Sequence, residues 1–260
     1  MKINFELNPP KIVKEEHFDL LTLKGEIQKL VQRAQTLIEY ADGIHLTDSV
    51  LGIPRLSSIT AASFIIKNIR SSPPSSSQSA AISCSVRTRD RNFTSICQFV
   101  SDAILLHIDS LLFLMGDEPS DGPKDSGLKP SNALKMLRYE RYHESINLDL
   151  TVPSKVKEVS SIQKKIDAKP RAFVTQSISS LSDLENIVHV SKRSGIKVVA
   201  CIMVPAEKNK FSAETIGLNW KEYEDNPVDF IKQAAEIADE VTITSPGSFK
   251  VGIDLLRHLQ

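Results

Sequence analysis

Glu6 is the residue near the start of the chain with the clearest potential for chemistry. Ile3, Phe5 and Leu7 alternate with Asn4 and Glu6, so the carboxylate lies on the strand face opposite three large apolar side chains. Inside a closed sheet, burial would raise the pKa of this carboxyl group, and a raised pKa suits a general acid. At an exposed edge Glu6 would be solvated instead, and its position alone leaves both readings open.

Gly116 and Asp117 form a second candidate site, directly after the most apolar run in the chain. Glycine allows the backbone to approach a ligand closely, and Asp117 would project beside it. A simple turn is the alternative, because glycine, aspartate and proline are common turn residues. The segment 87–92 is also ambiguous: it could bind phosphate, or it could begin a helix capped by Asp90 or Asn92 with its charges paired locally.

These polar residues follow short apolar runs that divide the chain almost evenly. The runs are 2–7, 42–46, 80–86, 110–115, 146–150, 172–175, 197–204 and 240–244. Several are continuous Val, Ile, Leu and Phe, as in a parallel sheet covered by helices. The segments between them carry apolar residues at helical spacing, such as Leu20, Leu23 and Ile27.

Eight strand–helix units in 260 residues predict one domain, a (β/α)8 TIM barrel. A doubly wound open sheet has the same alternation, but the absence of G-x-G-x-x-G after the first strand favours the barrel. Loops after the strand carboxyl ends form the mouth of such a barrel, where polar residues carry functional weight. They are Glu6, Thr47, Asp48, residues 87–92, residues 116–118, Thr175, Gln176, Thr244 and Ser245.

The composition is that of an ordinary soluble domain, with 25% charged and 41% hydrophobic residues. Its 32 basic and 32 acidic residues give no reason to expect nucleic acid or an anionic membrane as a partner. The polar N-terminus and the absence of a long apolar run predict a cytoplasmic protein. Cys84, Cys97 and Cys201 lack metal-ligand spacing and are expected to be reduced thiols, and the Ser/Pro-rich segment 71–79 is expected to be a loop.

Three single residues carry weaker expectations. His45, within the second run, is expected to be a hydrogen-bonded core histidine rather than a catalytic one. Trp220 and Tyr223 lie three residues apart, and they could either stack on a flat ring or pack a helix.

Several short motifs, in order along nearly the whole chain, resemble the methylenetetrahydrofolate reductase family. They are Phe-Glu-x-x-Pro-Pro at 5–10, the segments 42–48 and 54–57, Arg-Asp-Arg-Asn at 89–92, Gly-Asp-Glu-Pro at 116–119, Lys-Lys-Ile-Asp-Ala at 164–168 and Phe-Val-Thr-Gln at 173–176. Each motif alone is weak, but their shared order and spacing make a strong pattern.

The resemblance implies a (β/α)8 barrel that binds FAD at its mouth and reduces it with NADH or NADPH. The hydride then passes to 5,10-methylenetetrahydrofolate, giving 5-methyltetrahydrofolate for one-carbon metabolism and methionine synthesis. Glu6 would be the acid that protonates the folate so that its bridging ring opens. Asp117 would lie beside the flavin and the pterin, and Gln176 would contact the pterin and, in the other half-reaction, the nicotinamide.

The resemblance also implies a set of FAD contacts. They are Thr47, Asp48, Ser85, Gly116, Asp117, Lys165 at the diphosphate, and Glu158, Ser161 and Lys164. The last three are expected to share a helix with Lys165, with all four side chains on one helical face.

Two departures from the family keep alternatives open. Ser85 stands where family members usually carry a histidine near the flavin, and residues 201–205 replace a Pro-Gly-Ile-Leu-Pro segment that helps form the folate pocket. The chain could therefore reduce methylene-tetrahydromethanopterin, take electrons from another protein, or be a non-catalytic pterin-binding partner subunit. The resemblance also implies a homo-oligomer.

Overall fold

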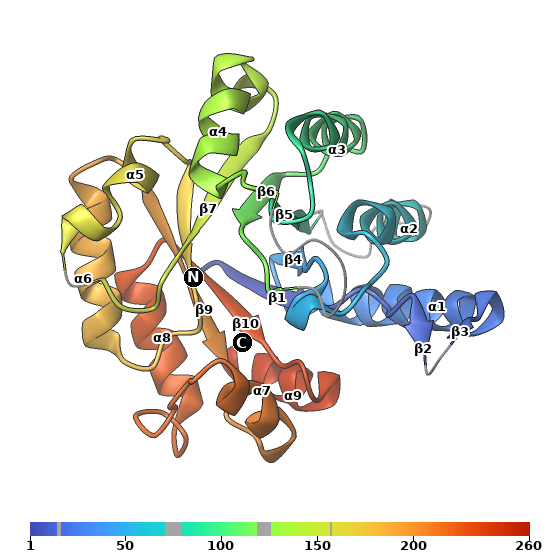
Figure 1. Ribbon diagram of the computed structural model, residues 1–260. Coiled ribbons are helices and arrows are strands. Elements are labelled where there is room, and N and C mark those ends of the chain that lie inside the picture. Colours follow the sequence, from blue (N-terminus) through green and yellow to red (C-terminus); the bar gives the residue numbers. More distant parts are fainter. Residues whose placement is uncertain (15–16, 71–79, 119–125, 157) are drawn as a thin grey trace. The chain divides into compact units, whose positions relative to one another are not determined.

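The main sheet of the computed structural model is a closed barrel with the strand order β1-β10-β9-β8-β7-β6-β5-β4 (Figure 1). The structure describes residues 1–14, 17–70, 80–118, 126–156 and 158–260. The barrel strands are β1 (Ile3–Leu7), β4 (Gly43–Leu46), β5 (Ala81–Arg87), β6 (Ser110–Leu114), β7 (Asn147–Val152), β8 (Ala172–Thr175), β9 (Lys197–Met203) and β10 (Glu240–Thr244). The predicted (β/α)8 barrel is confirmed, because every predicted run forms one of these strands.

Helices follow the strands, as the spacing of apolar residues predicts. They are α1 (Leu20–Leu37), α2 (Ser58–Arg70), α3 (Phe93–Leu105), α4 (Pro130–Tyr139), α5 (Gln163–Ile166), α6 (Leu181–Lys192), α7 (Lys210–Thr215), α8 (Pro227–Ile237) and α9 (Phe249–Leu259). Short 3-10 turns are η1 (Val50–Gly52), η2 (Tyr142–Glu144), η3 (Val159–Ser161) and η4 (Glu207–Asn209). A small antiparallel hairpin of β2 (Val13–Lys14) and β3 (His17–Phe18) is too short to leave a periodic signal in the sequence.

The chain divides into two compact units. Unit 1 comprises residues 1–6, 40–42 and 149–260, and unit 2 comprises residues 7–39 and 43–148. The predicted loop at 71–79 lies outside the described residues.

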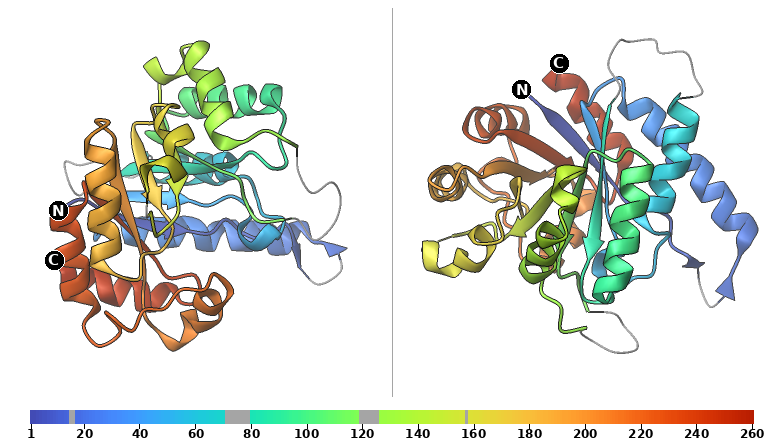
Figure 2. Two further views of the ribbon diagram at one scale, coloured as in Figure 1. Left: turned by 60° about the vertical axis from the view of Figure 1, so that its left-hand side comes forward. Right: turned by 90° about the horizontal axis from the view of Figure 1, so that it is seen from above.

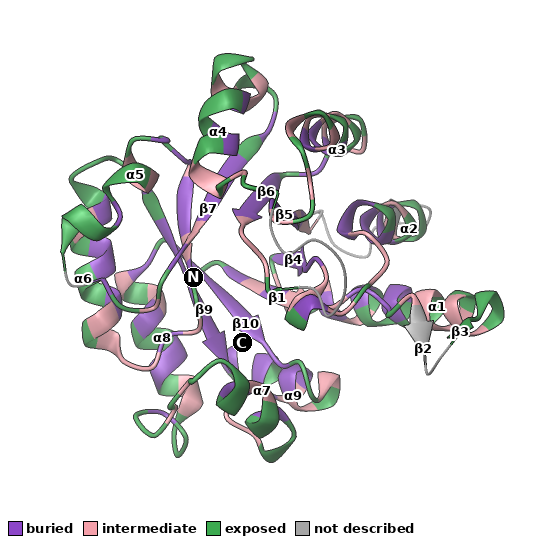
Figure 3. Cartoon of the chain, viewed as in Figure 1, coloured by how far each residue is buried: buried purple, intermediate pink, exposed green. Residues whose placement is uncertain are grey.

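In unit 1, parallel strand β10 pairs with β1 on one side and with β9 on the other. The sheet continues from β9 through β8 to β7. All five residues of β10 are buried, and Figure 3 shows the same for most of β9. Helix α6 begins after Ser180, whose hydroxyl accepts a hydrogen bond from the Asp183 amide. It buries Leu184, Ile187 and Val188, so its apolar stripe covers β9.

An ion cluster lies at the N-terminal ends of the unit 1 strands. Arg171 donates to both carboxylate oxygens of Asp149, at 2.8 and 2.7 Å, and to Glu240 at 3.1 Å. Lys2 also lies 3.1 Å from Glu240. Burial alone would raise the pKa of Glu240, but the charges of Arg171 and Lys2 lower it. This end of the unit is therefore held by paired charges.

In unit 2, parallel strands β4, β5 and β6 are covered by helices in chain order. Helix α2 packs on β4 and β5, and α4 packs on β6. Each of the helices α1 to α4 also contacts the next one along the chain, so that the four form a row (Figure 2). Asn92 caps α3, since its side chain accepts a hydrogen bond from the Ser95 amide at 2.9 Å. One of the two predicted readings of segment 87–92, a helix start, is thus confirmed.

Candidate functional site

Glu6 lies where the alternation of β1 predicts. Ile3, Phe5 and Leu7 are buried, and Phe5 packs edge-on against Phe249 of α9 with ring centroids 6.1 Å apart. Glu6 therefore occupies the strand face that turns away from this helix.

The Glu6 side chain is half-buried, and its carboxyl group accepts a hydrogen bond from Thr244 Oγ1 at 2.7 Å. Burial raises the pKa of Glu6 above its ordinary value of 4.5, and the hydrogen bond from Thr244 offsets only part of that rise. The nearby thiol of Cys201 is affected in turn: burial and the charge of Glu6 raise its pKa to about 12. Unit 1 thus holds an acid that keeps its proton at higher pH than a solvated glutamate.

Gln176 follows the end of β8, in the same unit as Glu6. Its backbone amide donates to Val152 O at 2.9 Å, while its side chain is exposed. Thr175 beside it is buried and accepts a hydrogen bond from the Cys201 amide at 3.0 Å. The exposed amide of Gln176 is therefore carried on a backbone fixed to both neighbouring strands.

The residues between 158 and 165 do not form the single helix that was predicted. The 3-10 turn η3 ends at Ser161, and α5 begins after Ile162, whose φ of −117° and ψ of 6° interrupt the helix. Ser161 Oγ donates to Glu158 O at 2.6 Å, so this hydroxyl caps its own turn. The expected common helical face of Glu158, Ser161 and the two lysines is wrong for that reason.

Lys165 is half-buried, and Lys164 beside it is exposed. Lys165 Nζ donates to Thr151 O at 2.6 Å, and burial lowers the pKa of this amine. Two adjacent ammonium groups, one partly withdrawn from water, suit an anionic ligand.

In unit 2, Thr47 and Asp48 lie directly after β4 and are both buried. Thr47 Oγ1 donates to Asn8 Oδ1 at 2.7 Å, and Asp48 accepts a hydrogen bond from Arg91 at 2.8 Å. Both side chains already have partners within the protein.

Ser85 bonds to a histidine of the neighbouring strand. His45 Nδ1 lies 2.8 Å from Ser83 Oγ, and His45 Nε2 lies 2.9 Å from Ser85 Oγ. Burial lowers the pKa of His45 to about 4, so the imidazole is neutral near pH 7. The prediction that His45 is a satisfied core histidine is confirmed. The sequence did not reveal its pairing with Ser85, because that contact depends on the register between β4 and β5.

Gly116 and Asp117 lie against Arg87 at the ends of β5 and β6. Gly116 has a φ of +84°, and a Cβ atom there would lie 2.9 Å from three atoms of the Arg87 side chain. The space beside Gly116, which the sequence suggested was open for a ligand, is therefore occupied by the Arg87 side chain. The Asp117 side chain is exposed and accepts a hydrogen bond from the Leu51 amide at 2.7 Å.

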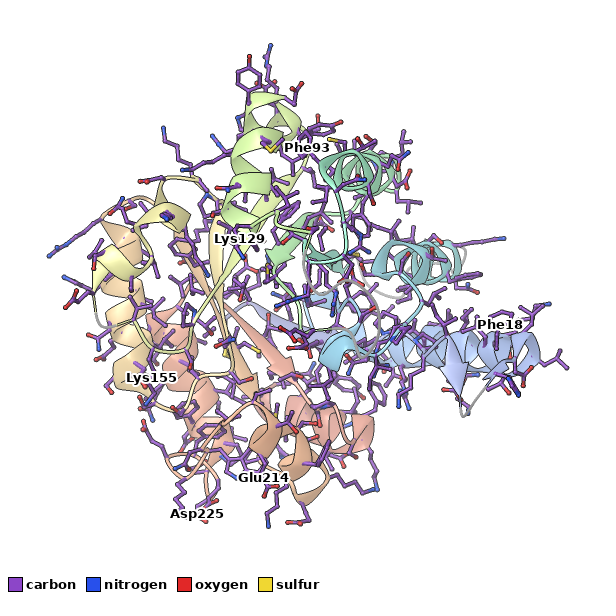
Figure 4. The ribbon with its side chains drawn as sticks, in the orientation of Figure 1. Phe18, Phe93, Lys129, Lys155, Glu214 and Asp225 are labelled. Carbon is purple, nitrogen blue, oxygen red and sulfur yellow. The ribbon has the colours of Figure 1, made fainter. Side chains whose placement is uncertain are left out.

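A cavity of about 500 Å³ lies within the unit 1 segment after β9. Its lining includes Pro205, Ala206, Glu207, Lys210, Ala213, Glu214, Leu218, Asn219, Trp220, Lys221 and Glu224. Glu214 and Asp225 of this segment, labelled in Figure 4, are both exposed. Tyr223 is buried instead, stacked on Phe230 with centroids 4.3 Å apart, so it packs a helix and Trp220 lines the cavity.

The described part of the chain has no group of three or more His, Cys, Asp or Glu side chains placed to hold a metal ion. Among the same residues, no helix combines the length and apolar character needed to cross a membrane.

Fold and polar strand ends together define a (β/α)8 barrel with candidate sites at the carboxyl ends of its strands. No protein-family model and no curated protein matches the chain. Among solved structures, the tryptophan synthase complex of Pyrococcus furiosus aligns over 99% of this chain and 94% of its own, with 13% identity and a TM-score of 0.58. Tryptophan synthase from M. tuberculosis aligns over 99% and 89%, with 12% identity and a TM-score of 0.53. At these identities the likeness shows the barrel fold alone.

Proposed function

We propose that this protein is a flavin-dependent reductase that converts 5,10-methylenetetrahydrofolate to 5-methyltetrahydrofolate. The observation that carries the proposal is Glu6, a partly buried carboxyl group with a raised pKa and a hydrogen bond from Thr244, at the carboxyl end of a barrel strand. The order of the motifs that resemble methylenetetrahydrofolate reductases supports the choice of reaction.

Protonated Glu6 can donate its proton to one of the two nitrogens that the methylene carbon bridges. The bond from that nitrogen to the methylene carbon then breaks, which leaves an electrophilic iminium on the other nitrogen. Thr244 holds one oxygen of the acid through its 2.7 Å hydrogen bond, so the carboxyl group keeps a fixed orientation. A carboxylic acid held neutral by its surroundings is the form that this step needs.

FAD, when bound, would carry the hydride from NADH or NADPH to the methylene carbon. The side chains present fit such a group, because Lys164 and half-buried Lys165 offer two positive charges to a diphosphate. The resemblance also assigns Thr47, Asp48 and Ser85 of unit 2 to the flavin, and each of these side chains is already hydrogen-bonded within unit 2.

Gln176 in unit 1 and Asp117 in unit 2 are the other two residues that the resemblance assigns to the pterin. The exposed Gln176 amide can both donate to and accept from a pterin edge, which carries donors and acceptors side by side. The exposed Asp117 carboxylate can accept hydrogen bonds from an amino group of the pterin and adds negative charge beside the flavin.

The proposal is tested by separating the two half-reactions in anaerobic stopped flow, with the flavin absorbance band as the signal. We expect the purified protein to bind FAD, NADH or NADPH to bleach the band, and 5,10-methylenetetrahydrofolate to restore it. Glu6→Gln should keep the bleaching and slow the restoration at least a hundredfold, because only the second step needs the acid. Glu185→Gln on the exposed side of α6 is the matched control and should behave as wild type.

Each other outcome points elsewhere. If the reduced flavin is reoxidised by methylene-tetrahydromethanopterin and not by the folate, the substrate part of the proposal is wrong. If NADH and NADPH fail but a chemical reductant succeeds, the electron donor is another protein. Failure to bind FAD at all would contradict the reductase and favour a pterin-binding partner subunit.

The proposal extends to location and assembly. Cys84, Cys97 and Cys201 are free thiols, which favours the reducing cytoplasm. The proposed assembly is a homo-oligomer, with a reduced pterin and a nicotinamide nucleotide as small-molecule ligands, and neither nucleic acid nor membrane as a partner. Light scattering during chromatography would test the assembly.

A further inference from the structure

Arg87, the last residue of β5, has an almost fully buried side chain that is only 2% exposed. Its guanidinium makes four hydrogen bonds that reach three different loops of unit 2. Two go to Asp90, at 2.6 and 3.1 Å, one goes to Ser49 O at 2.7 Å, and one goes to Asp117 O at 2.7 Å. The loops after β4, β5 and β6 are therefore all hydrogen-bonded to the planar guanidinium of Arg87.

The charge of Arg87 is balanced by Asp90. Nε and Nη2 contact the two carboxylate oxygens in the paired geometry typical of arginine and carboxylate. A guanidinium so paired and so buried has little left to offer a phosphate. The predicted alternative of phosphate binding at this residue thus has no support in the geometry, and Arg87 acts on the protein itself.

Arg87 fixes the backbone of Gly116 and Asp117. Its side-chain atoms would lie 2.9 Å from a Cβ at position 116, so the Arg87 side chain fills the space that a larger residue at this position would need. The adjacent carbonyl of Asp117 accepts one of its hydrogen bonds. Contact and hydrogen bond together hold this turn, in which Gly116 has a φ of +84°.

Arg87 also holds the loop that contacts the Asp117 carboxylate. Ser49 O accepts from Arg87, and two residues further on the Leu51 amide donates to Asp117 Oδ2 at 2.7 Å. Ser49 and Leu51 have φ values of 45° and 58°, which is costly for side chains of these types and needs external support. Arg87 thus bonds the Asp117 carbonyl directly and also bonds the loop whose Leu51 amide contacts the Asp117 carboxylate.

We infer that Arg87 is the positioning residue for Asp117, and that it sets the orientation of this carboxylate without touching a ligand itself. The inference rests on the proposed function only for the role of Asp117 in the reaction. Asp117, Leu51 and Arg87 all belong to unit 2, so the positioning can also be measured in the unliganded protein.

The first test uses amide hydrogen exchange on the unliganded full-length protein. Arg87→Lys keeps the charge but loses the planar fork, so we expect the Leu51 amide, which donates to Asp117 Oδ2, to exchange at least tenfold faster. Core amides of α3 should be unchanged. Arg141→Lys is the matched control, because Arg141 makes the same two-bond pair with Glu144, three residues further on, at an exposed site. Unchanged Leu51 exchange in Arg87→Lys would overturn the inference.

Asp90→Asn covers the case in which Arg87→Lys does not fold. The Asp90 side chain is 41% exposed, so this variant is expected to fold while weakening the hold on Arg87. It should raise Leu51 exchange in the same direction by a smaller factor, and no change would count against the inference.

The second test is a double-mutant cycle in the folate half-reaction. If Arg87 acts through Asp117, Arg87→Lys slows the reaction about tenfold in wild type and adds almost nothing in an Asp117→Asn background. Additive losses would contradict positioning. A wild-type protein that binds no flavin would contradict the proposed function alone, because the exchange measurement needs no ligand.

Discussion

His45 Nε2 on β4 lies 2.9 Å from the hydroxyl of Ser85 on the neighbouring strand β5. The family that this chain resembles usually carries a histidine at the position of Ser85. In this structure the imidazole bonded to the Ser85 hydroxyl belongs to the adjacent strand, because His45 and Ser83 are register partners and Ser85 follows two residues later on the same strand face. The Ser85 hydroxyl is therefore already engaged within the protein.

His45 should resist protonation until about pH 4. The unfolded chain binds this proton near pH 6.5, so stability should fall as pH drops from about 6.5 to about 4 and level off below. The expected loss from this residue is about 3 kcal/mol. Urea unfolding of wild type and His45→Gln across this range checks it, since the variant should lack that part of the slope. A ring that titrates near 6.5 by NMR would contradict the burial argument.

Glu6→Gln should make the protein more stable at neutral pH. The raised pKa of Glu6 means that its contribution to stability is fully present below 4.5 and is lost as pH rises through the folded-state pKa. An uncharged amide removes that loss while it keeps the shape of the side chain. Thermal unfolding at several pH values should show the gap between variant and wild type widening above pH 4.5. A gap that does not depend on pH would mean that Glu6 is already ionised at little cost.

Gly116→Ala should cost more stability than Gly127→Ala. Both glycines have positive φ, at +84° and +77°, but an added Cβ meets the Arg87 side chain at position 116 and nothing within 4 Å at position 127. The strained backbone costs about 1 kcal/mol at either site, and the collision adds about 1–3 kcal/mol at Gly116. Equal losses in chemical denaturation would show that Arg87 moves aside freely.

Arg171→Met should destabilise the protein by about 3 kcal/mol at pH 7, because it removes the guanidinium that pairs with buried Asp149 through two hydrogen bonds. Glu240 loses one of its two cationic partners at the same time. Arg193→Met at an exposed site serves as the control. The loss should shrink as pH falls and these carboxylates become protonated, and a loss that persists at low pH would point to packing instead.

The barrel could be predicted because each strand is marked by a local apolar run. The strand face that carries the Glu6 side chain could also be predicted, because the alternation of apolar and polar residues over 3–7 is enough to distinguish the two faces of the strand. Both inferences use neighbours in sequence. They succeed because the two-residue repeat of a strand and the 3.6-residue repeat of a helix follow from backbone geometry.

The parts that the sequence did not reveal depend on long-range contacts or on single backbone angles. The pairing of His45 with Ser85 joins residues 40 positions apart, and the hydrogen bond from Leu51 to Asp117 spans 66. Ile162 interrupts the expected helix through its own φ and ψ, although its side chain fits the helical pattern. The sequence permits Arg87 to be a ligand-binding cation, and only its four hydrogen bonds to Ser49, Asp90 and Asp117 show that the guanidinium is engaged within the protein.

Phe5 on β1 is packed by residues near the other end of the sequence. Its ring lies against Phe249, and an added Cβ at Gly252 of α9 would collide with it. Strand β1 likewise pairs with β10, where Phe5 is the partner of Ile243. During synthesis on the ribosome, β1 leaves the exit tunnel long before β10 and α9 exist. The face of β1 that carries Phe5 must wait for almost the whole chain to emerge, so nascent chains that stall before residue 240 would expose this strand to chaperones.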